Sequence, residues 1–334
     1  MIGYYIHHHG KGHLTRASAI TERIGSPVTA LTSASPGGGT PFADHVHLPL
    51  DSPSSQRNPT VNGAFHWAPF HDHGLSARMM HIAEWITMAR PRAIVVDVSV
   101  EVTVFVRLMG IPVVVIAMPG QRTDPAHQLA YRIADHIIAA WPSEIYEPDW
   151  LHEFAGKTSY VGGISRFDGR DRTTTTPTSQ RPRILVLSGA GGSQTSSDDI
   201  QMCAAQHDSF QWTALGVNGT KWVDDPWKEL CTSDVVISHA GQNSIADVAT
   251  AQRPAIVISE DRPFDEQRAT AQALSAHNLS ISLPHWPVAD RWPSLIADAA
   301  AIGGHGWSSW RTTGAADRAA AIIEMIAERM GNST

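Results

Sequence analysis

The sequence predicts an α/β protein made of two Rossmann-like domains, each built on a doubly wound parallel sheet. Three observations lead to this prediction. The chain has 334 residues, which exceeds one ordinary domain and suits two domains of about 150 residues each. Short apolar runs alternate along the chain with segments of helical period. Each half opens with a strand, a glycine-bearing loop and a helix, at residues 2–16 and again from residue 184.

The composition is that of an ordinary globular protein. Hydrophobic residues make up 42% of the chain and charged residues 17%, so each domain can bury a sizeable core. The net charge of −7 comes without a basic stripe, which argues against nucleic acid as a partner. A nearly neutral first half leaves contact with a membrane surface open.

Cysteine usage and the start of the chain indicate a cytoplasmic protein. Cys203 and Cys231 lack metal-site spacing and are expected to be buried thiols in a reducing compartment. The chain enters a strand at once, without a cationic leader, and no apolar run approaches membrane-spanning length. A peripheral position at the inner face of the membrane stays open.

The first domain is expected over residues 1–165. Its first strand, Ile2–Ile6, leads into a loop of histidines and glycines that opens a helix. Asp97 follows a later buried strand, and the carboxyl ends of such strands face the crevice where α/β proteins bind ligands. Asp97 is therefore a candidate to orient a base or to position an acceptor, and Glu101, one turn later, is the second choice. Further strands are expected at 28–33, 93–96, 113–117 and 137–139.

Residues 50–75 form a long irregular stretch rich in Pro, Ser, Asn and His, with aromatic residues between them. A stretch of this kind inside a compact domain is usually functional or mobile. We expect an acceptor-side loop in which Trp67 is available to stack on a sugar ring or a lipid. A surface loop pinned by core aromatics is the alternative. Arg122, in a later loop, is placed to meet an acceptor anion.

Residues 166–182 are expected to link the domains, because threonines, a proline and charges are typical of linkers. The second domain is expected over 183–311, and an alanine-rich helix within 312–334 should pack back across the first domain. The strand from Ile184 leads directly into the glycine loop Ser188–Ser193. This repeats the opening design and indicates a phosphate contact.

The most informative stretch follows the apolar run Val235–Ile237, where His239, small residues and Asn243-Ser244 precede a helical pattern. A helix N-terminus with unpaired N–H groups and a positive dipole end favours an anion. Asp247 lies one turn after Asn243 and should face the same side, which suits a ribose diol beside a diphosphate. An ordinary helix cap at Asn243 or Ser244 is the simpler alternative.

These residues carry a resemblance to known enzymes. The string from His239 to Ser244, followed by Asp247 and by Asp265-Glu266-Gln267, resembles the nucleotide-sugar signature of family 1 glycosyltransferases. The same region is similar to family 28 enzymes. The pattern from Gly10 to Arg16 resembles their first loop, and Gly191–Gln194 resembles their Gly-Gly-Ser-Gln loop. The resemblance implies the GT-B fold, in which two Rossmann-like domains face a cleft.

The resemblance also implies roles for particular residues. The donor would be a UDP-sugar bound without a metal or other cofactor, and the reaction would invert the anomeric centre. Trp222 lies beside the implied nucleoside segment and is alternatively ordinary core. The implied groups are the diphosphate ligands Gly191, Gly192, Ser193, His239, Gly241, Gln242, Asn243 and Ser244, the nucleoside ligands Val223 and Asp247, and the donor-sugar ligands Asp265, Glu266 and Gln267.

His13 is the candidate general base, because family 28 enzymes have a cleft histidine here and imidazole titrates near neutrality. His7, His8 and His9 are its competitors, and a capping role in the loop is the bland alternative. The histidine spacings match no zinc pattern, and the Asp-x-Asp motif of metal-dependent glycosyltransferases is absent, so we expect no metal. The acceptor-binding candidates are Arg16, Trp67, Glu101 and Arg122.

The sequence thus favours a glycosyltransferase that moves a sugar from a UDP-sugar to an acceptor hydroxyl. A nucleotide-sugar hydrolase or epimerase on the same fold is the first alternative, and a donor-binding subunit without catalysis is the second. The acceptor stays open among a lipid carrier, a wall polymer and a small molecule.

Overall fold

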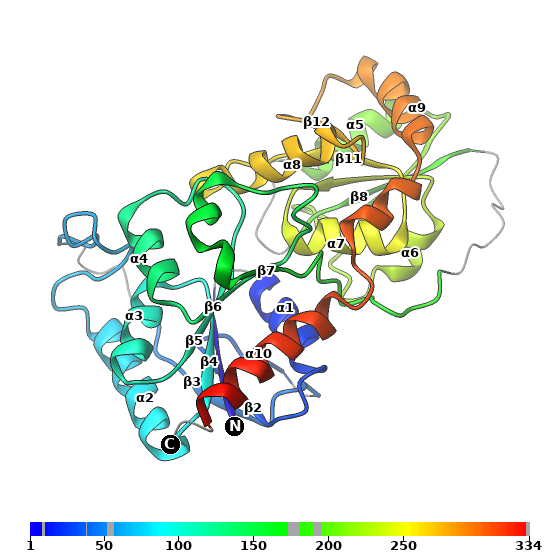
Figure 1. The fold of residues 1–334 in the computed structure, drawn as a ribbon. Helices are drawn as coiled ribbons and strands as arrows, with labels where there is room; N and C mark the ends of the chain where they lie inside the picture. The colour runs from blue at the N-terminus through cyan, green and yellow to red at the C-terminus, as the bar shows by residue number, and fades with distance from the viewer. Residues whose placement is uncertain (9–10, 38, 52–56, 173–180, 190–194, 332–334) are drawn as a thin grey trace.

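The computed structural model describes residues 1–8, 11–37, 39–51, 57–172, 181–189 and 195–331. Among them, two separate sheets form, and every strand pairing in both sheets is parallel. Helices cover both sheets, and in Figure 1 the second sheet is drawn above and to the right of the first. The predicted pair of parallel-sheet α/β domains is therefore confirmed.

The first sheet has seven strands in the order β3-β2-β1-β4-β5-β6-β7. The edge strand β3 and the short strand β7 were not predicted, because both are half-exposed and lack an apolar run. The elements of this half are β1 (Ile2–Ile6), α1 (Gly12–Thr21), β2 (Val28–Thr32), β3 (Asp44–His47), α2 (His73–Ala89), β4 (Ala93–Asp97), α3 (Val100–Leu108), β5 (Val113–Ala117), α4 (Pro125–Ile133), β6 (His136–Ala139), the 3₁₀ segment η1 (Asp149–Lys157) and β7 (Thr158–Tyr160).

The second sheet has five strands in the order β12-β11-β10-β8-β9. Its elements are β8 (Arg183–Leu187), α5 (Ser197–Gln206), β9 (Gln211–Leu215), α6 (Trp227–Thr232), β10 (Val235–His239), α7 (Gln242–Ala251), β11 (Ala255–Ile258), η2 (Pro263–Asp265), α8 (Glu266–Ala276), β12 (Ile281–Leu283), η3 (Ala289–Arg291), α9 (Trp292–Ile302) and η4 (His305–Trp310), and α10 (Ala315–Gly331) ends the chain.

Both strand orders reverse at one point, between β1 and β4 in the first sheet and between β8 and β10 in the second. The crevice at the carboxyl ends of the strands on either side of such a switch is where open α/β sheets bind ligands. In the first sheet Ile6 pairs with Asp97 at this place, and in the second β10 ends at His239. The topology therefore directs the predicted site residues of both domains to such crevices.

The C-terminal helix α10 returns to the first domain and lies beside α1, as Figure 1 shows in red and blue. Its apolar side, which includes Ala319 and Ile323, is fully buried in one cluster with Ile20 of α1 and Val95 of β4. Small alanines let the helix approach the sheet closely, which explains its alanine-rich composition.

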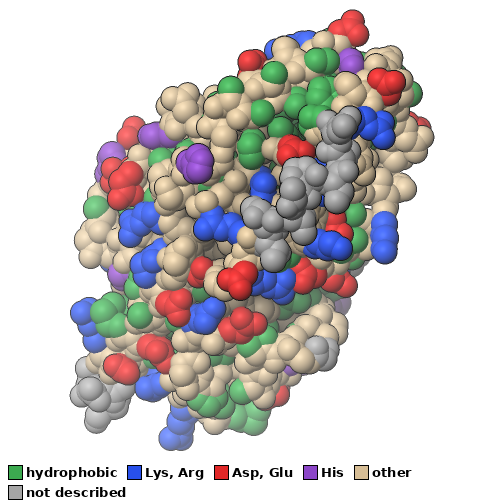
Figure 2. Space-filling view, turned by 90° about the vertical axis from the view of Figure 1, so that its right-hand side faces the viewer, with side chains coloured by type: hydrophobic (Ala, Val, Ile, Leu, Met, Phe, Trp, Pro, Cys, Tyr) green, Lys and Arg blue, Asp and Glu red, His purple; other side chains and the backbone are tan. Residues whose placement is uncertain are grey.

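The distribution of charge on the surface and the length of the helices agree with what the composition predicts. On the face drawn in Figure 2, positive and negative side chains intermingle and form no broad basic stripe. No helix within the described part of the chain is long and apolar enough to cross a membrane.

Close packing at the centre of the first sheet makes Gly3 a sensitive position. A Cβ on Gly3 would lie 2.8 Å from the Trp85 ring and 2.9 Å from Ile94. We expect Gly3→Ala to lower the free energy of unfolding by roughly 1–3 kcal/mol, because overpacking forces neighbours off their rotamers. Urea denaturation measures the effect, with Gly156→Ala as control, since no described atom lies within 4 Å of that Cβ. Equal stability of the two variants would contradict the packing described here.

Candidate active site

The N-termini of α1 and α7 meet where the two domains touch. Asn243 Nδ2 donates to the carbonyl oxygen of Gly12 at 2.8 Å, and a Cβ on Gly12 would lie 3.7 Å from the same nitrogen. Within the described residues, neither helix has a side-chain cap on its first turn, so these N–H groups are available to a ligand. The positive ends of two helices therefore converge on one place.

His13 and Asp97 form a hydrogen-bonded pair at this junction. His13 Nδ1 lies 2.9 Å from Asp97 Oδ1, and Asp97 is fully buried. Burial by itself would raise the pKa of Asp97, but the Arg16 guanidinium and His13 outweigh it and hold the pKa well below its usual range. Because an ionised carboxylate only accepts, His13 Nδ1 donates to it, and in the neutral ring Nε2 then carries the lone pair.

Arg16 links this pair to the second domain. It donates to both oxygens of Asp97, at 2.6 and 3.2 Å, and its NH1 group donates to Gln242 Oε1 at 2.6 Å. Arg16 is only 3% exposed, and the role predicted for it in acceptor binding stays a prediction. The Arg16 guanidinium pairs with Asp97 and holds the Gln242 side chain in place.

Gln242 has a feature that points to a ligand. Its Nε2 group is buried and has no hydrogen-bond partner among the described residues, while its Oε1 is held by Arg16. An unpaired buried donor is costly unless a ligand satisfies it. Gln242 is the first residue of α7, so this donor and the backbone N–H groups of the first turn serve the same site.

Small residues surround the start of α7. Cβ atoms placed on Gly189 and Gly241 would lie 3.8 and 4.0 Å from Ser244 Oγ, so both glycines lie beside the Ser244 side chain. Gly241 is the N-cap of α7, and Gln242, Asn243 and Ser244 form its first turn, which is where the anion site is predicted. The other predicted diphosphate ligands in the loop after β8, Gly191, Gly192 and Ser193, lie outside the described residues.

His239 ends β10 immediately before this site. The ring is mostly buried, and its Nδ1 donates to the carbonyl oxygen of Ile258 at 3.2 Å. Burial lowers the pKa of His239, although Glu260, whose carboxylate lies 3.4 Å away, opposes this effect. The ring is therefore expected to be neutral at pH 7 and held in one orientation by the backbone.

Asp247 differs from its prediction. Its side chain is 6% exposed, and its two oxygens accept from Ser165 Oγ at 2.7 Å and Arg166 Nε at 3.2 Å. Both partners belong to the segment that leaves the first domain, so Asp247 anchors this segment to α7. The ribose contact stays a prediction, and these two bonds are the contacts that the carboxylate makes in this structure.

The predicted nucleoside segment also differs in detail. Val223 is partly buried against the core, whereas the neighbouring Trp222 is 39% exposed and is not ordinary core. Lys11 from the first domain places Nζ 4.7 Å from the centre of the Trp222 ring and 3.7 Å from Asp224. Sequence reasoning missed Lys11, because only the fold brings the first loop to this segment.

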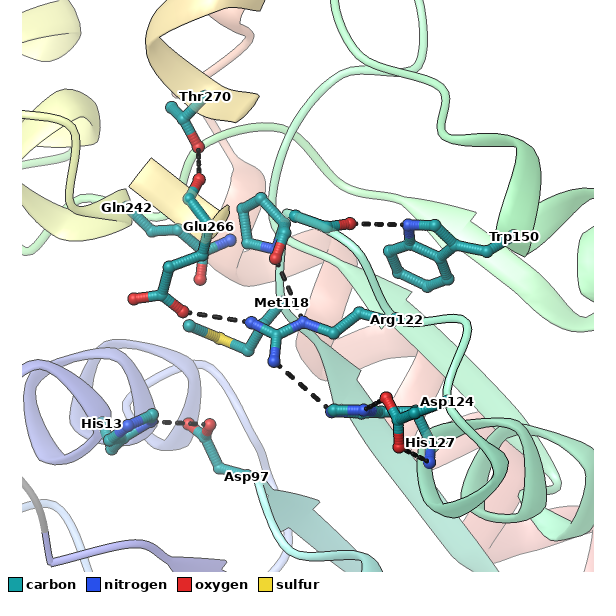
Figure 3. Close-up of polar contacts among 12 residues, drawn as sticks. His13, Asp97, Met118, Arg122, Asp124, His127, Trp150, Gln242, Glu266 and Thr270 are labelled. Atoms are coloured by element: carbon teal, nitrogen blue, oxygen red, sulfur yellow. Dashed lines mark hydrogen bonds and ion pairs between the residues drawn. The ribbon is translucent and has the colours of Figure 1, made fainter. Parts of the chain in front are cut away.

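The three predicted sugar ligands divide into different environments. Gln267 is 7% exposed, and its Oε1 accepts from the backbone N–H of Glu260, so it holds its own loop. Asp265 is exposed beside Arg268. Glu266 Oε2 accepts from Arg122 at 3.1 Å, and Figure 3 shows the carboxylate turned toward the Arg122 guanidinium.

Arg122, which was predicted to meet an acceptor anion, pairs with Glu266 in this structure. It is 3% exposed and reaches across the domain boundary to Glu266, so it offers no free charge to an acceptor anion. A long side chain in a loop gave no sequence signal that it would be buried.

A cavity of about 150 Å³ lies at the carboxyl edge of the first sheet. Its wall includes Trp67 and Glu101, two of the predicted acceptor ligands, and also His7, whose ring centre lies 5.8 Å from that of His13. Trp67 Nε1 is buried without a partner among the described residues, which suits a ligand oxygen. Glu101 instead accepts the backbone N–H groups of His66 and Trp67, at 2.8 and 2.9 Å, and so shapes the loop.

His66, Asp124 and His127 form a cluster that sequence reasoning did not identify and that has metal-ligating side chains. Asp124 caps α4 and contacts both rings, at 2.9 Å for His66 and 2.5 Å for His127. Burial lowers the pKa of His127 to about 4, and Arg122 NH1 lies 3.4 Å from its Nε2. These contacts account for the cluster as a capping network, and the neighbouring guanidinium opposes a second cation.

Residues 183–286 match the model of the glycosyltransferase family 28 C-terminal domain, which confirms the family 28 resemblance for the second domain. Solved structures are similar over nearly the whole chain. The glycotransferase of kitacinnamycin is 16% identical, with 97% of this chain and 98% of that chain covered and a TM-score of 0.72. UGT89C1 of Arabidopsis thaliana, complexed with UDP, is 12% identical, with 98% and 99% covered and a TM-score of 0.67.

The spinosyn rhamnosyltransferase SpnG, complexed with thymidine diphosphate, is 13% identical, with 99% and 96% covered and a TM-score of 0.60. At these identities the similarity shows the fold, which is that of GT-B glycosyltransferases as predicted. Among curated proteins, no sequence matches the chain.

The buried carboxylate of Asp247 predicts a pH effect on stability. Burial, the largest influence, raises its pKa to about 6 in the folded protein, above about 3.9 in an unfolded chain. The folded state therefore binds this proton more tightly, so the contribution of Asp247 to stability falls as pH rises from about 4 to about 6 and is level above.

Asp247→Asn removes this titration. We therefore expect the urea midpoint of wild type, minus that of the variant, to be larger near pH 4 than at pH 7. Urea denaturation across the window measures it, and Asp290→Asn, at an exposed position, is the control. A difference that does not change with pH would show that Asp247 titrates normally.

Proposed function

We propose that this protein is an inverting, metal-independent glycosyltransferase that moves a sugar from a UDP-sugar to an acceptor hydroxyl. The family 28 match over the second domain and the GT-B fold support a glycosyltransferase of this type. The observation that carries the proposal is the hydrogen-bonded network that joins the His13–Asp97 pair, through Arg16, to Gln242 at the start of α7.

The residues of the first domain support a role for His13 as the general base. Asp97 is ionised and receives Nδ1–H of His13, so Nε2 is the nitrogen that can take a proton from an acceptor hydroxyl. As the hydroxyl oxygen forms its bond to the anomeric carbon, the bond from that carbon to the diphosphate oxygen breaks. The proton moves to His13, and the imidazolium is stabilised by Asp97. Attack from the side opposite the leaving group inverts the anomeric centre.

The start of α7 in the second domain supports stabilisation of the leaving nucleotide. The backbone N–H groups at the start of α7, the positive end of its dipole and Gln242 Nε2 are fixed donors for the diphosphate. Donors already aimed at developing negative charge are a large catalytic term. They would supply the charge stabilisation that metal-dependent enzymes obtain from a cation.

The cavity beside His7 supports transfer to an acceptor rather than to water. Trp67 lines this cavity of about 150 Å³ and offers an aromatic ring on which an acceptor could stack. The nucleotide is proposed to be UDP on the basis of the signature resemblance. One structural relative is complexed with UDP and another with thymidine diphosphate, so dTDP is the direct competitor in any binding assay.

Loss of the base should abolish most of the turnover. We expect His13→Ala to lower kcat by roughly 10²–10⁴-fold, the range of general base catalysis, while UDP affinity stays nearly unchanged. Steady-state kinetics with the wild-type donor and acceptor measure the effect, and His277→Ala, at an exposed position, is the control. Full turnover in His13→Ala with loss in His7→Ala or His8→Ala would assign the base to another histidine.

Turnover should not require a divalent cation. If α7 and Gln242 stabilise the leaving diphosphate, EDTA leaves the rate unchanged and added Mn²⁺ or Mg²⁺ does not raise it. The measurement is the initial rate of nucleotide release in metal-depleted buffer with and without each cation. A rate that depends strictly on Mn²⁺ would refute metal independence and leave the fold assignment intact.

A further inference from the structure

A second contact between the domains lies beside the site and joins residues 119–127 to residues 262–267. The backbone N–H of Gln121 donates to the carbonyl oxygen of Phe264 at 2.7 Å. Gly120 has φ +95°, and a Cβ there would lie 2.2 Å from this carbonyl oxygen and 2.8 Å from the backbone of Glu266. Only glycine allows the two segments to come this close.

Arg122 forms the centre of this contact (Figure 3). Its Nε donates to the carbonyl oxygen of Pro119 at 3.1 Å, and its NH2 donates to Glu266 Oε2 at 3.1 Å. The guanidinium also lies 4.5 Å from the centre of the Phe264 ring. A cation that is 3% exposed needs a fixed counter-charge, and Glu266 is the carboxylate bound to it.

The segment that carries Glu266 has an unusual backbone. Phe264 and Asp265 are consecutive non-glycine residues with φ of 61° and 54°, in the left-handed region that bulky side chains rarely adopt. Such conformations persist only where the surrounding contacts impose them. Here the Phe264 ring packs edge-on against His127 with ring centres 4.7 Å apart, and lies 5.4 Å from His66. Residues of the first domain therefore contact one side of the strained segment.

We propose that Arg122 and Gly120 are positioning residues for donor-sugar recognition, acting through Glu266. This inference rests on the proposed function. Arg122 holds Glu266 Oε2, and the close approach at Gly120 sets the backbone of the same residue. Oε1, which has no hydrogen bond within the described residues, is the oxygen offered to a sugar hydroxyl. The first domain thus contributes to recognition of the donor sugar without contacting the sugar.

The sugar and the nucleotide of the donor would be bound by different residues. Gln242 and the first turn of α7 serve the diphosphate, and neither contacts Arg122 through a described hydrogen bond or ion pair. Loss of Arg122 should therefore weaken binding of a nucleotide sugar and spare binding of the nucleotide alone. A role in overall stability alone would not change the two affinities differently.

The test is calorimetric titration of the full chain with UDP, UDP-glucose, UDP-N-acetylglucosamine, dTDP and dTDP-glucose. The readout is the ratio of the Kd for the tightest nucleotide sugar to the Kd for its free nucleotide. We expect Arg122→Met to raise this ratio at least fivefold, and Arg122→Lys, which keeps a cation for Glu266, to restore part of the loss. Arg132→Met is the matched control, because Arg132 pairs with Glu153 at 3.2 Å but is exposed.

A second variant serves if Arg122→Met does not fold. Gly120→Ala keeps every charged group and should raise the ratio by pushing the two segments apart. Gly110→Ala is its control, since Gly110 also has a positive φ of 78° but no described atom within 4 Å of its Cβ. An unchanged ratio in a folded Arg122→Met or Gly120→Ala protein, or equal weakening of nucleotide and nucleotide sugar, would overturn the proposal. Failure of wild type to bind any of the five ligands would instead overturn the proposed function itself.

Discussion

A buried carboxylate, Asp97, is the group on which the rest of the site depends. It lies fully buried at the end of β4, where the strand order of the first sheet reverses, and it stays charged because Arg16 and His13 both pair with it. Without that charge His13 would lose the partner that fixes its tautomer, and Arg16 would lose the counter-ion that allows its burial. The bond from Arg16 to Gln242 extends the same network into the second domain.

The boundary between the domains is built from close contacts at a few small residues. Gly12 approaches Asn243 on one side of the site, and Gly120 approaches Phe264 and Glu266 on the other. Charged and polar pairs accompany both contacts, from Arg16 to Gln242 and from Arg122 to Glu266. Residues that hold the domains together thus lie next to residues proposed to bind the donor. Binding and the relative position of the domains are therefore linked in this fold.

Much of this arrangement was predictable from local sequence. Apolar runs located most of the buried strands, and the position of Asp97 directly after such a run placed it at the crevice. Glycines and polar residues before α7 correctly marked the helix start that faces the first domain. These features are set by residues close together in the chain, so a single sequence contains their signal.

The rest depended on contacts between distant segments. Helical spacing placed Asp247 on the same helix as Asn243, but could not show that Ser165 and Arg166 would occupy its carboxylate. Arg16 and Arg122 were predicted to bind the acceptor, but nothing in a loop or a first turn shows that a long cationic side chain will be buried. Pairing over 144 residues, from Arg122 to Glu266, is visible only in the folded chain.

A crystal structure of the protein with UDP tests the central claim most directly. The account predicts that the β-phosphate accepts hydrogen bonds from the first-turn N–H groups of α7 and from Gln242 Nε2, with His13 Nε2 facing the space beyond it. A nucleotide bound elsewhere, or bound at α7 with its diphosphate turned away from His13, would contradict the account.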